Sequence, residues 1–513
     1  MQSFSELLRT HIHNKGIDVQ KLSAYLNISP SLLYKVMKGT RTLTEQNQLK
    51  KICEYLNLTV GEQEALTKAH VISVIGEDRF SARLNIEKFL RNLSGFNPSN
   101  STLPPLEESA DIPKLNFSEL SKTYESEHAV QLIVNLLLRY ESYQENSHLR
   151  MVFDLDDDYL ASLLSTLDNN SIEIEHIMSL RTNNYGQNGD MASYLNLNVL
   201  SSILSATSFN SNYHPYYYFR NVESQVPFLS MNSMILLPEA VLLIATDKSS
   251  AILLTDSSLI NYYMKIFGRL KSSCSPFINK VINLDMMADY LSSMTKNKAF
   301  CSRYELQIDP CIFIHMPQDI FLKYVNRALM ENNTIKQVYG EYRKQLYKNY
   351  QSGTSRSYHT VDGFKRFLET GITQELPDQA FSPVDLQDRI TCIKNLLKAI
   401  ERKEYNALLL KNWPYSTSGF IVSITNQAIS FQVKNRTGYT VYLLLDIPRF
   451  LISFNDFFEN VIDHMCHTHE ETIAIIKHLL EEAEERLQSK EERGPAKEGR
   501  GPAKEGRLPD KAN

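Results

Sequence analysis

Apolar positions recur at helical spacing through the first 70 residues. They predict five helices, over 3–14, 18–26, 30–38, 44–56 and 60–69. The second and third are short and are joined by a tight turn at Asn27-Ile28. Ser29 can cap the third helix, Pro30 fits its first turn, and Gly39 can end it in a left-handed conformation. The stretch 22–39 is therefore predicted to be helix, turn, helix.

From about 119 to 490 the pattern changes between helical and strand-like periods. Helices are predicted at 118–144, 157–168, 192–206, 257–271, 282–295, 318–330, 333–350, 361–370, 385–402 and 469–488. Strands are predicted at 151–155, 172–178, 240–246, 251–255, 304–308, 312–315, 407–410, 419–425, 428–433 and 440–445. Helices and antiparallel hairpins in this order predict a large α+β body behind an all-α N-terminal domain, in a multidomain chain.

Two parts of this body resemble each other. A hairpin at 241–256 ends in Asp256 and leads into a helix, and a hairpin at 429–446 ends in Asp446 and does the same. This similarity predicts two related α/β halves, 119–280 and 281–490. A different strand order in the two halves would contradict this prediction.

A segment rich in Asn, Ser, Pro and Gly separates the helical start from the body. The expected organisation is a helix-turn-helix domain at 1–69, a connecting helix and linker at 70–118, the two halves, and a tail at 491–513. The tail repeats Gly-Pro-Ala-Lys-Glu-Gly-Arg and has almost nothing apolar to bury, so we expect it to be disordered.

Charge is distributed unevenly. The chain has a net charge of −5, yet residues 1–51 hold eight Lys or Arg against three acidic residues, which leaves the remainder at −10. A basic end on an acidic body predicts a polyanionic partner at that end. The apolar runs are too short to span a membrane, the first residues do not form a secretion leader, and six cysteines are widely scattered. We therefore expect a cytoplasmic protein that does not bind membranes.

The N-terminal pattern resembles the helix-turn-helix domain of the Xre, Cro and phage-repressor family over about residues 4–68. The resemblance is carried by the turn from Leu26 to Ser29 and by the exit Lys38-Gly39-Thr40-Arg41. Two positions depart from the family: Val19 stands where Gln or Ser often opens the second helix, and Met37 stands where Glu often precedes the exit. The resemblance implies binding to double-stranded DNA as a homodimer on paired half-sites.

Individual positions can be assigned to the two kinds of DNA contact. Ser31, Tyr34 and Lys35 lie on the outward side of the third helix and are the candidates for reading base edges. Contacts to the phosphate backbone are expected from Ser29, Lys38, Thr40 and Arg41. The alternative is a small helical bundle that contacts protein through a solvated basic face.

The body offers three weaker clusters. Four aspartates could suit a hard cation but also suit a solvated turn: Asp154, Asp156, Asp157 and Asp158. Zinc-ligand residue types crowd a helix end, without a partner pair at zinc-finger spacing: His464, Cys466, His467 and His469. A tyrosine-rich stretch could line a pocket for a small molecule or peptide, or form a half-buried strand: Tyr213, Tyr216, Tyr217 and Tyr218. For the aspartates a solvated turn is the favoured interpretation, and for the second cluster an ordinary helix end is favoured. No metal is therefore expected.

No phosphate-binding Gly loop, nucleophile elbow or HExxH helix occurs, so no catalytic residue and no cofactor is assigned. The sequence therefore predicts a non-enzymatic, sequence-specific transcriptional regulator with a large sensing or oligomerisation region. Two alternatives remain. The body could bind a partner protein, as in antitoxin-like proteins, and a copurifying partner would favour that. It could instead be an enzyme, which a closed pocket with convergent, perturbed carboxylates or histidines would favour.

Overall fold

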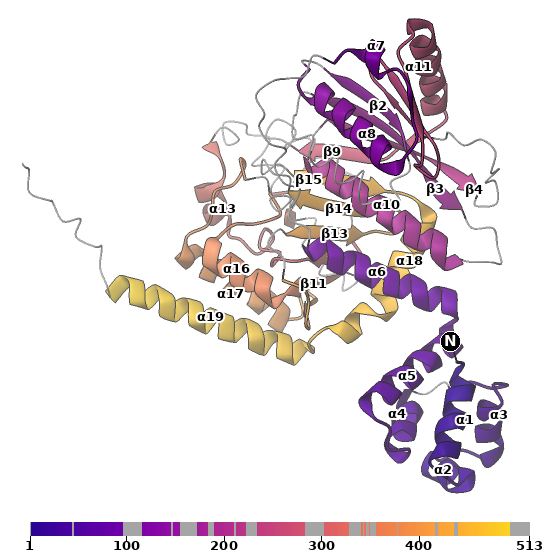
Figure 1. Ribbon diagram of the computed structural model, residues 1–513. Helices are drawn as coiled ribbons and strands as arrows, with labels where there is room; N and C mark the ends of the chain where they lie inside the picture. Colours follow the sequence, from indigo (N-terminus) through magenta and orange to yellow (C-terminus); the bar gives the residue numbers. More distant parts are fainter. Residues whose placement is uncertain are drawn as a thin grey trace, which may run out of the picture.

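The computed structural model describes residues 2–492 except for several gaps (Figure 1). The gaps are 44–45, 96–114, 145–146, 154–171, 183–188, 210–211, 222–232, 283–301, 328–339, 342, 345–347, 349–354, 377, 416–418 and 435–439. The expected aspartate cluster, most of the linker, the C-terminal tail and the helices predicted at 157–168 and 282–295 lie outside the described residues.

The N-terminal domain is a bundle of five helices around its own core. Its helices are α1 (Phe4–Asn14), α2 (Val19–Tyr25), α3 (Pro30–Met37), α4 (Gln46–Tyr55) and α5 (Val60–Ile75). Capping residues fix where they begin: Ser3 and Thr59 form capping boxes, and the Asp18 carboxylate accepts from the Gln20 N–H. Apolar residues at helical spacing, among them Leu8, Leu22 and Leu33, are fully buried between the helices. The predicted helical domain is therefore confirmed.

The first sheet of the body contains three parallel strands and an antiparallel meander. Its described strands follow the order β1-β7-β6-β5-β2-β3-β4-β8. Their bounds are β1 (Thr123–Tyr124), β2 (His148–Val152), β3 (Glu173–Thr182), β4 (Tyr213–Asn221), β5 (Ser233–Leu236), β6 (Val241–Ile244), β7 (Ala251–Leu254) and β8 (Ser275–Pro276). Strands β2, β3 and β4 run parallel, and β5 joins β2 antiparallel.

The second sheet repeats this arrangement. Its order is β12-β11-β10-β13-β14-β15-β9. The strands are β9 (Ile278–Ile282), β10 (Tyr304–Gln307), β11 (Arg356–Thr360), β12 (Ala407–Leu410), β13 (Phe420–Ile424), β14 (Ile429–Lys434) and β15 (Thr440–Leu445). Strands β10, β11 and β12 run parallel, and the meander β13-β14-β15 attaches antiparallel to β10.

The two sheets therefore share one strand order, in which β2 to β7 correspond to β10 to β15 in sequence, position and direction. An edge strand, β1 or β9, pairs antiparallel with the last meander strand in each. This agreement supports the prediction of two related halves. The shared aspartates differ in role, however: Asp256 caps the helix that follows it, whereas Asp446 is exposed and Ile447 occupies the cap position.

Helices fill the space between the sheets and cover their outer faces. They are α7 (Phe117–Leu120), α8 (Glu127–Ser142), α10 (Gly189–Phe209), α11 (Ser257–Ser272), α13 (Gln318–Tyr324), α16 (Val361–Thr370), α17 (Leu386–Glu401), α18 (Pro448–Asn460) and α19 (His469–Glu492), with a 3₁₀ helix at Ile462–Met465. Helix α10 contacts β3 and β4 of the first sheet and β14 and β15 of the second, so it lies between them (Figure 1). One apolar core accordingly joins the facing sides of both sheets.

The helix α6 (Glu77–Gly95), expected to be a connector, is part of this shared core. Ile86, Phe89, Leu90 and Leu93 are buried among residues of both sheets. Figure 1 shows α6 running along the body with the N-terminal domain at its end. The N-terminal domain is thus attached to a helix that the body itself holds.

Several local predictions were wrong. Residues 312–315, predicted as a strand, form a turn that leads toward α13, and the helix predicted over 118–144 is divided into α7, β1 and α8. Strands β5 and β11 were missed because neither follows an alternating apolar pattern in the sequence. In the part of the chain that the structure describes, no helix is long and apolar enough to cross a membrane.

Candidate nucleic-acid interface

Helix α3 has one buried and one exposed side. Leu33 and Val36 are fully buried in the core of the domain. Ser31, Tyr34 and Lys35 are exposed, Tyr34 to 49 %. Their spacing of three and four residues places them on one face of the helix. The structure therefore brings the three predicted base-reading residues together on an open surface.

The start of α3 is held by a cap. The Ser29 hydroxyl accepts a hydrogen bond from the Leu32 N–H at 3.2 Å, and Pro30 occupies the first helical position. Asn27 in the preceding turn has φ 55°, a left-handed conformation that asparagine tolerates. The Ser29 proton stays available to donate to a phosphate while its oxygen caps the helix.

The exit from α3 carries the remaining predicted phosphate contacts. Lys38, Thr40 and Arg41 are exposed. The Thr40 hydroxyl donates to the Lys35 carbonyl at 3.1 Å, so its proton is already used within the domain. Among the described residues, the side chains of Lys38 and Arg41 make no hydrogen bond or ion pair. These two cations are therefore the stronger phosphate-binding candidates, and Thr40 is the weaker one.

The exit also depends on a glycine. Gly39 has φ +74°, and a Cβ atom there would lie 3.1 Å from Oγ of Ser5 at the start of α1. The exit loop is thus closed tightly against α1, which fixes the positions of Lys38 and Arg41 on either side of it. No acidic residue occurs between 29 and 41, so every charged side chain of α3 and its exit is basic.

One candidate was missed in the sequence. Val19, at the position where the related domains often carry Gln or Ser, packs against the core of the domain. Gln20, one position later in the first turn of α2, is exposed. The sequence indicates this position, because Asp18 is the N-cap of α2 and Gln20 therefore lies in its first turn. Gln20 is therefore an additional candidate for a backbone contact.

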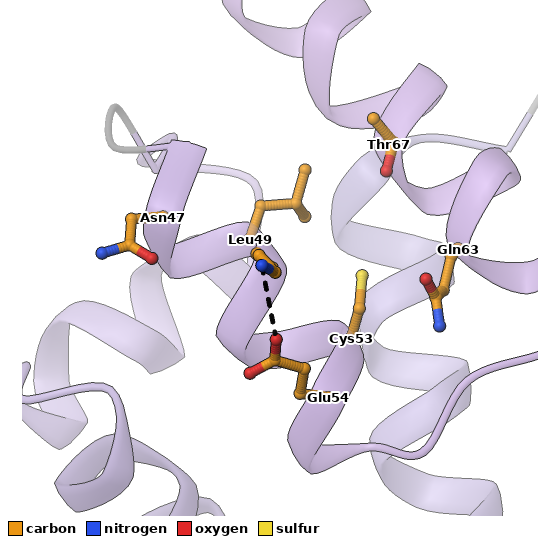
Figure 2. A pocket seen from close by; sticks show the side chains of 7 residues that line it. Asn47, Leu49, Cys53, Glu54, Gln63 and Thr67 are labelled. Atoms are coloured by element: carbon orange, nitrogen blue, oxygen red, sulfur yellow. Dashed lines mark ion pairs between the residues drawn. The ribbon is translucent and has the colours of Figure 1, made fainter.

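A pocket lies elsewhere on the same domain, between α4 and α5 (Figure 2). Its volume is about 430 Å³, and its lining residues are Asn47, Leu49, Lys50, Cys53, Glu54, Gln63 and Thr67. The Lys50 ammonium lies 3.9 Å from the Glu54 carboxylate, and burial raises the pKa of the Cys53 thiol. Helix α3 contributes no residue to this pocket, so the pocket is separate from the exposed face of α3.

The four tyrosines predicted to line a ligand pocket do not share one face of the sheet. Tyr213 is buried and its hydroxyl bonds Nδ1 of His176 at 2.8 Å, while Tyr217 packs against the same core. Tyr216 and Tyr218 point to the opposite face, toward α11. The alternation of side chains along β4 thus divides them into two pairs. Ligand contact at either pair stays a prediction.

The second half contains a buried cluster of ionisable groups that the sequence did not reveal. Asp309 and Cys311 follow β10, His359 lies within β11, and Tyr405 precedes β12. Together with the half-buried Glu375 they form what we call the buried polar cluster: Asp309, Cys311, His315, His359, Glu375 and Tyr405. Nε2 of His359 bonds the Tyr405 hydroxyl at 2.9 Å, and the His315 ring packs edge-on against Tyr405. The Glu375 carboxyl accepts from the Ile312 and Phe313 N–H groups, both at 3.0 Å.

Burial controls the protonation of this cluster. It raises the pKa of Glu375 to about 8 and lowers the pKa of His315 to about 3 and of His359 to about 4. At neutral pH both histidines are thus neutral and Glu375 is mostly protonated. Asp309 pairs with Arg366, yet its Oδ2 atom has no hydrogen-bond partner among the described residues.

No three metal-ligating side chains come together in the part of the chain that the structure describes. The thiol of Cys466 donates to the Ile462 carbonyl at 3.2 Å, and Nδ1 of His467 lies 3.4 Å from the Glu471 carboxylate. These contacts occupy two members of the His464–His469 stretch.

Comparisons with known proteins agree with the N-terminal geometry. Residues 8–63 match the family of Cro/C1-type helix-turn-helix DNA-binding domains. No curated protein matches the chain. Among solved structures, a polyphosphate kinase from Porphyromonas gingivalis is matched at 9 % identity over 69 % of this chain and 54 % of that chain, with a TM-score of 0.18. The chain spans about half the length of that structure, and so low a TM-score carries no inference about the body.

Proposed function

We propose that this chain, whose residues 8–63 form a Cro/C1-type helix-turn-helix DNA-binding domain, is a sequence-specific transcriptional regulator. The observation that carries the proposal is the surface of α3, where Ser31, Tyr34 and Lys35 share one exposed face beside a basic exit. A helix of this kind fits the major groove, in which each base pair presents a distinct pattern of donors and acceptors. The flanking cations then fix its register on the phosphates.

The body would supply sensing and oligomerisation. In this proposal the protein binds as a homodimer to paired half-sites, and a small-molecule or peptide effector changes the spacing of the two reading helices. The effector acts by binding one arrangement of the body more tightly than another, which changes the DNA affinity by linkage. The shared core of the two halves supports this role, because a change in either half can be passed to the other.

Selection of bound duplexes from a random pool tests the proposal. The full chain should enrich one motif, and in a dimer the motif should contain two related half-sites about 10 bp apart, or a multiple of that spacing. Light scattering of the complex gives the number of chains on each duplex. A pool that remains random after several rounds would remove the proposal.

An enzymatic body is the second candidate, favoured by the buried polar cluster. Perturbed pKa values and convergent polar groups of this kind also occur at catalytic sites. Structural burial explains the same shifts, so we propose that the body acts by binding. Screening the full chain for turnover, with Glu375→Gln as the matched inactive variant, would separate the two: an activity lost only in the variant would favour the enzyme.

A further inference from the structure

Helix α6 is anchored in both halves of the body. It contacts α10, which belongs to the first half, and α18, which belongs to the second. The Phe89 ring meets Phe431 at 5.8 Å and Phe454 at 6.1 Å between ring centroids, both nearly perpendicular. Such edge-to-face aromatic contacts have a defined geometry and hold the helix in one register. A displacement of one half relative to the other must therefore move α6 or break its packing.

The C-terminal end of α6 is fixed by the sole tryptophan of the chain. The Trp413 indole N–H donates to the Ser94 hydroxyl at 2.7 Å, and the Arg91 guanidinium lies 4.9 Å from the Trp413 ring centroid. Arg91 also donates to the Asn412 carbonyl at 3.1 Å. These contacts stabilise the last turns of the helix against the second half.

The first turns of α6 are held by a single carboxylate. Asp456 on α18 accepts from Arg79 Nε at 2.8 Å and from Arg83 Nε at 2.7 Å. The Asp456 side chain is 14 % exposed and that of Arg83 15 %, whereas that of Arg79 is 55 % exposed. Burial alone would raise the pKa of Asp456, but the two arginines outweigh it and lower the pKa to about 2. The contact is thus charged at any pH near neutral, and much of it is shielded from water.

A single residue separates this anchored helix from the DNA-binding domain. Gly76 ends α5 with φ +87° and ψ 153°, and α6 begins at Glu77. A Cβ atom at Gly76 would meet nothing within 4 Å, so glycine is needed there for its backbone conformation and not for close packing. Across the joint, the Lys68 ammonium lies 5.8 Å from the Phe80 ring centroid.

We propose that α6 is the lever through which the body sets the position of α3, with Asp456 as the clasp on its first turns and Gly76 as its joint. When Asp456 binds both arginines, α6 is a rigid extension of the body, and the DNA-binding domain moves with it. A shift between the halves that withdraws α18 from α6 opens the clasp and frees the reading helix. This inference rests on the proposed function only for its consequence on DNA binding.

Hydrogen–deuterium exchange of the full chain tests the clasp. In Asp456→Asn, exchange over 77–85 should rise at least tenfold, while exchange over 86–95 and within the DNA-binding domain stays unchanged. Arg79→Gln, at an exposed position that cannot unfold the body, should give a smaller rise over the same residues. The matched control is Asp463→Asn, which removes a carboxylate bonded to Arg356 and Tyr358 within the second half and should leave 77–85 unchanged.

Binding to the selected duplex tests the consequence. Affinity for paired half-sites should fall at least tenfold in Asp456→Asn and less than twofold in Asp463→Asn, with affinity for one half-site unchanged in both. Equal exchange over 77–85 in wild type and Asp456→Asn would overturn the clasp, and unchanged paired-site affinity despite faster exchange would overturn the lever. A wild-type chain that binds no selected duplex would instead remove the proposed function, which the exchange measurement does not depend on.

Discussion

Arg83 donates from Nε to Oδ2 of Asp456 at 2.7 Å, across 373 positions of sequence. This ion pair joins the helix that carries the DNA-binding domain to a helix of the second half of the body. The pair thus links two segments that lie far apart in the sequence. Measurable consequences are expected at Gly76, on the exposed face of α3 and in the buried polar cluster.

A substitution at Gly76 should change the angle between α5 and α6 without disturbing the packing of either core. Gly76→Ala forces an L-residue into φ +87°, which costs about 1–3 kcal/mol, so we expect the joint to adopt another angle while each core stays folded. Small-angle scattering should show a changed overall shape at an unchanged melting temperature of the body. Gly61→Ala, in the first turn of α5 with equal space around it, is the control and should leave the scattering curve unaltered.

The cap of α3 should contribute to the stability of the DNA-binding domain. Ser29→Ala removes the acceptor of the Leu32 N–H and should lower the free energy of unfolding of the domain by about 1 kcal/mol. Ser31→Ala, two positions later on the exposed face, should change it by less than about 0.5 kcal/mol. Chemical denaturation followed by circular dichroism measures both, and equal losses in the two variants would contradict the capping role.

Arg41 should supply affinity and little specificity. Arg41→Ala should weaken binding to all duplexes alike and reduce the slope of log K against log salt by about 0.9, the loss of one phosphate contact. Lys50→Ala removes the same charge at the α4–α5 pocket and should leave the slope nearly unchanged. If the two variants changed the slope equally, the basic exit of α3 would have no particular role.

The buried polar cluster should make stability depend on pH. The pKa of Glu375 is raised to about 8 from an ordinary 4.5, so its contribution is fully present below about 4.5 and is lost as the pH rises through 8. Over that window the free energy of unfolding should fall by up to about 1.4 kcal/mol per pH unit.

The variant Glu375→Gln cannot ionise, and its melting temperature should exceed that of the wild type increasingly from pH 5 to pH 8. Glu401→Gln, at a surface ion pair with Lys477, is the control for the charge change. Parallel melting curves for wild type and Glu375→Gln across this range would mean that the carboxyl does not titrate there.

The DNA-binding domain could be predicted from sequence because its determinants are local. These determinants are the caps at Asp18 and Ser29, the turn at Asn27 and the apolar spacing of α3. All lie within 20 residues, and each indicates a single local structure. The repeated hairpin led to the prediction of two related halves, and the strand order shared by the two sheets supports that prediction.

The body's sites could not be predicted in this way, because they depend on distant contacts. The buried polar cluster joins residues from 309 to 405, and nothing in the local pattern distinguishes Glu375 from a solvated glutamate. In the sequence, Asp456 is one acidic residue of an amphipathic helix. Only its contact with α6 in the structure distinguishes it. Alternation along β4 also divided tyrosines that stand together in the sequence.

Fluorescence anisotropy on the selected duplex and a scrambled one tests the central claim most directly. Tyr34 and Lys35 are exposed on the face of α3 that is proposed to read bases. Replacing both by Ala should lower the affinity ratio between the two duplexes at least tenfold, since one lost base contact costs about 1–3 kcal/mol, while scrambled-duplex affinity falls only slightly. An unchanged ratio in the double variant would contradict the account.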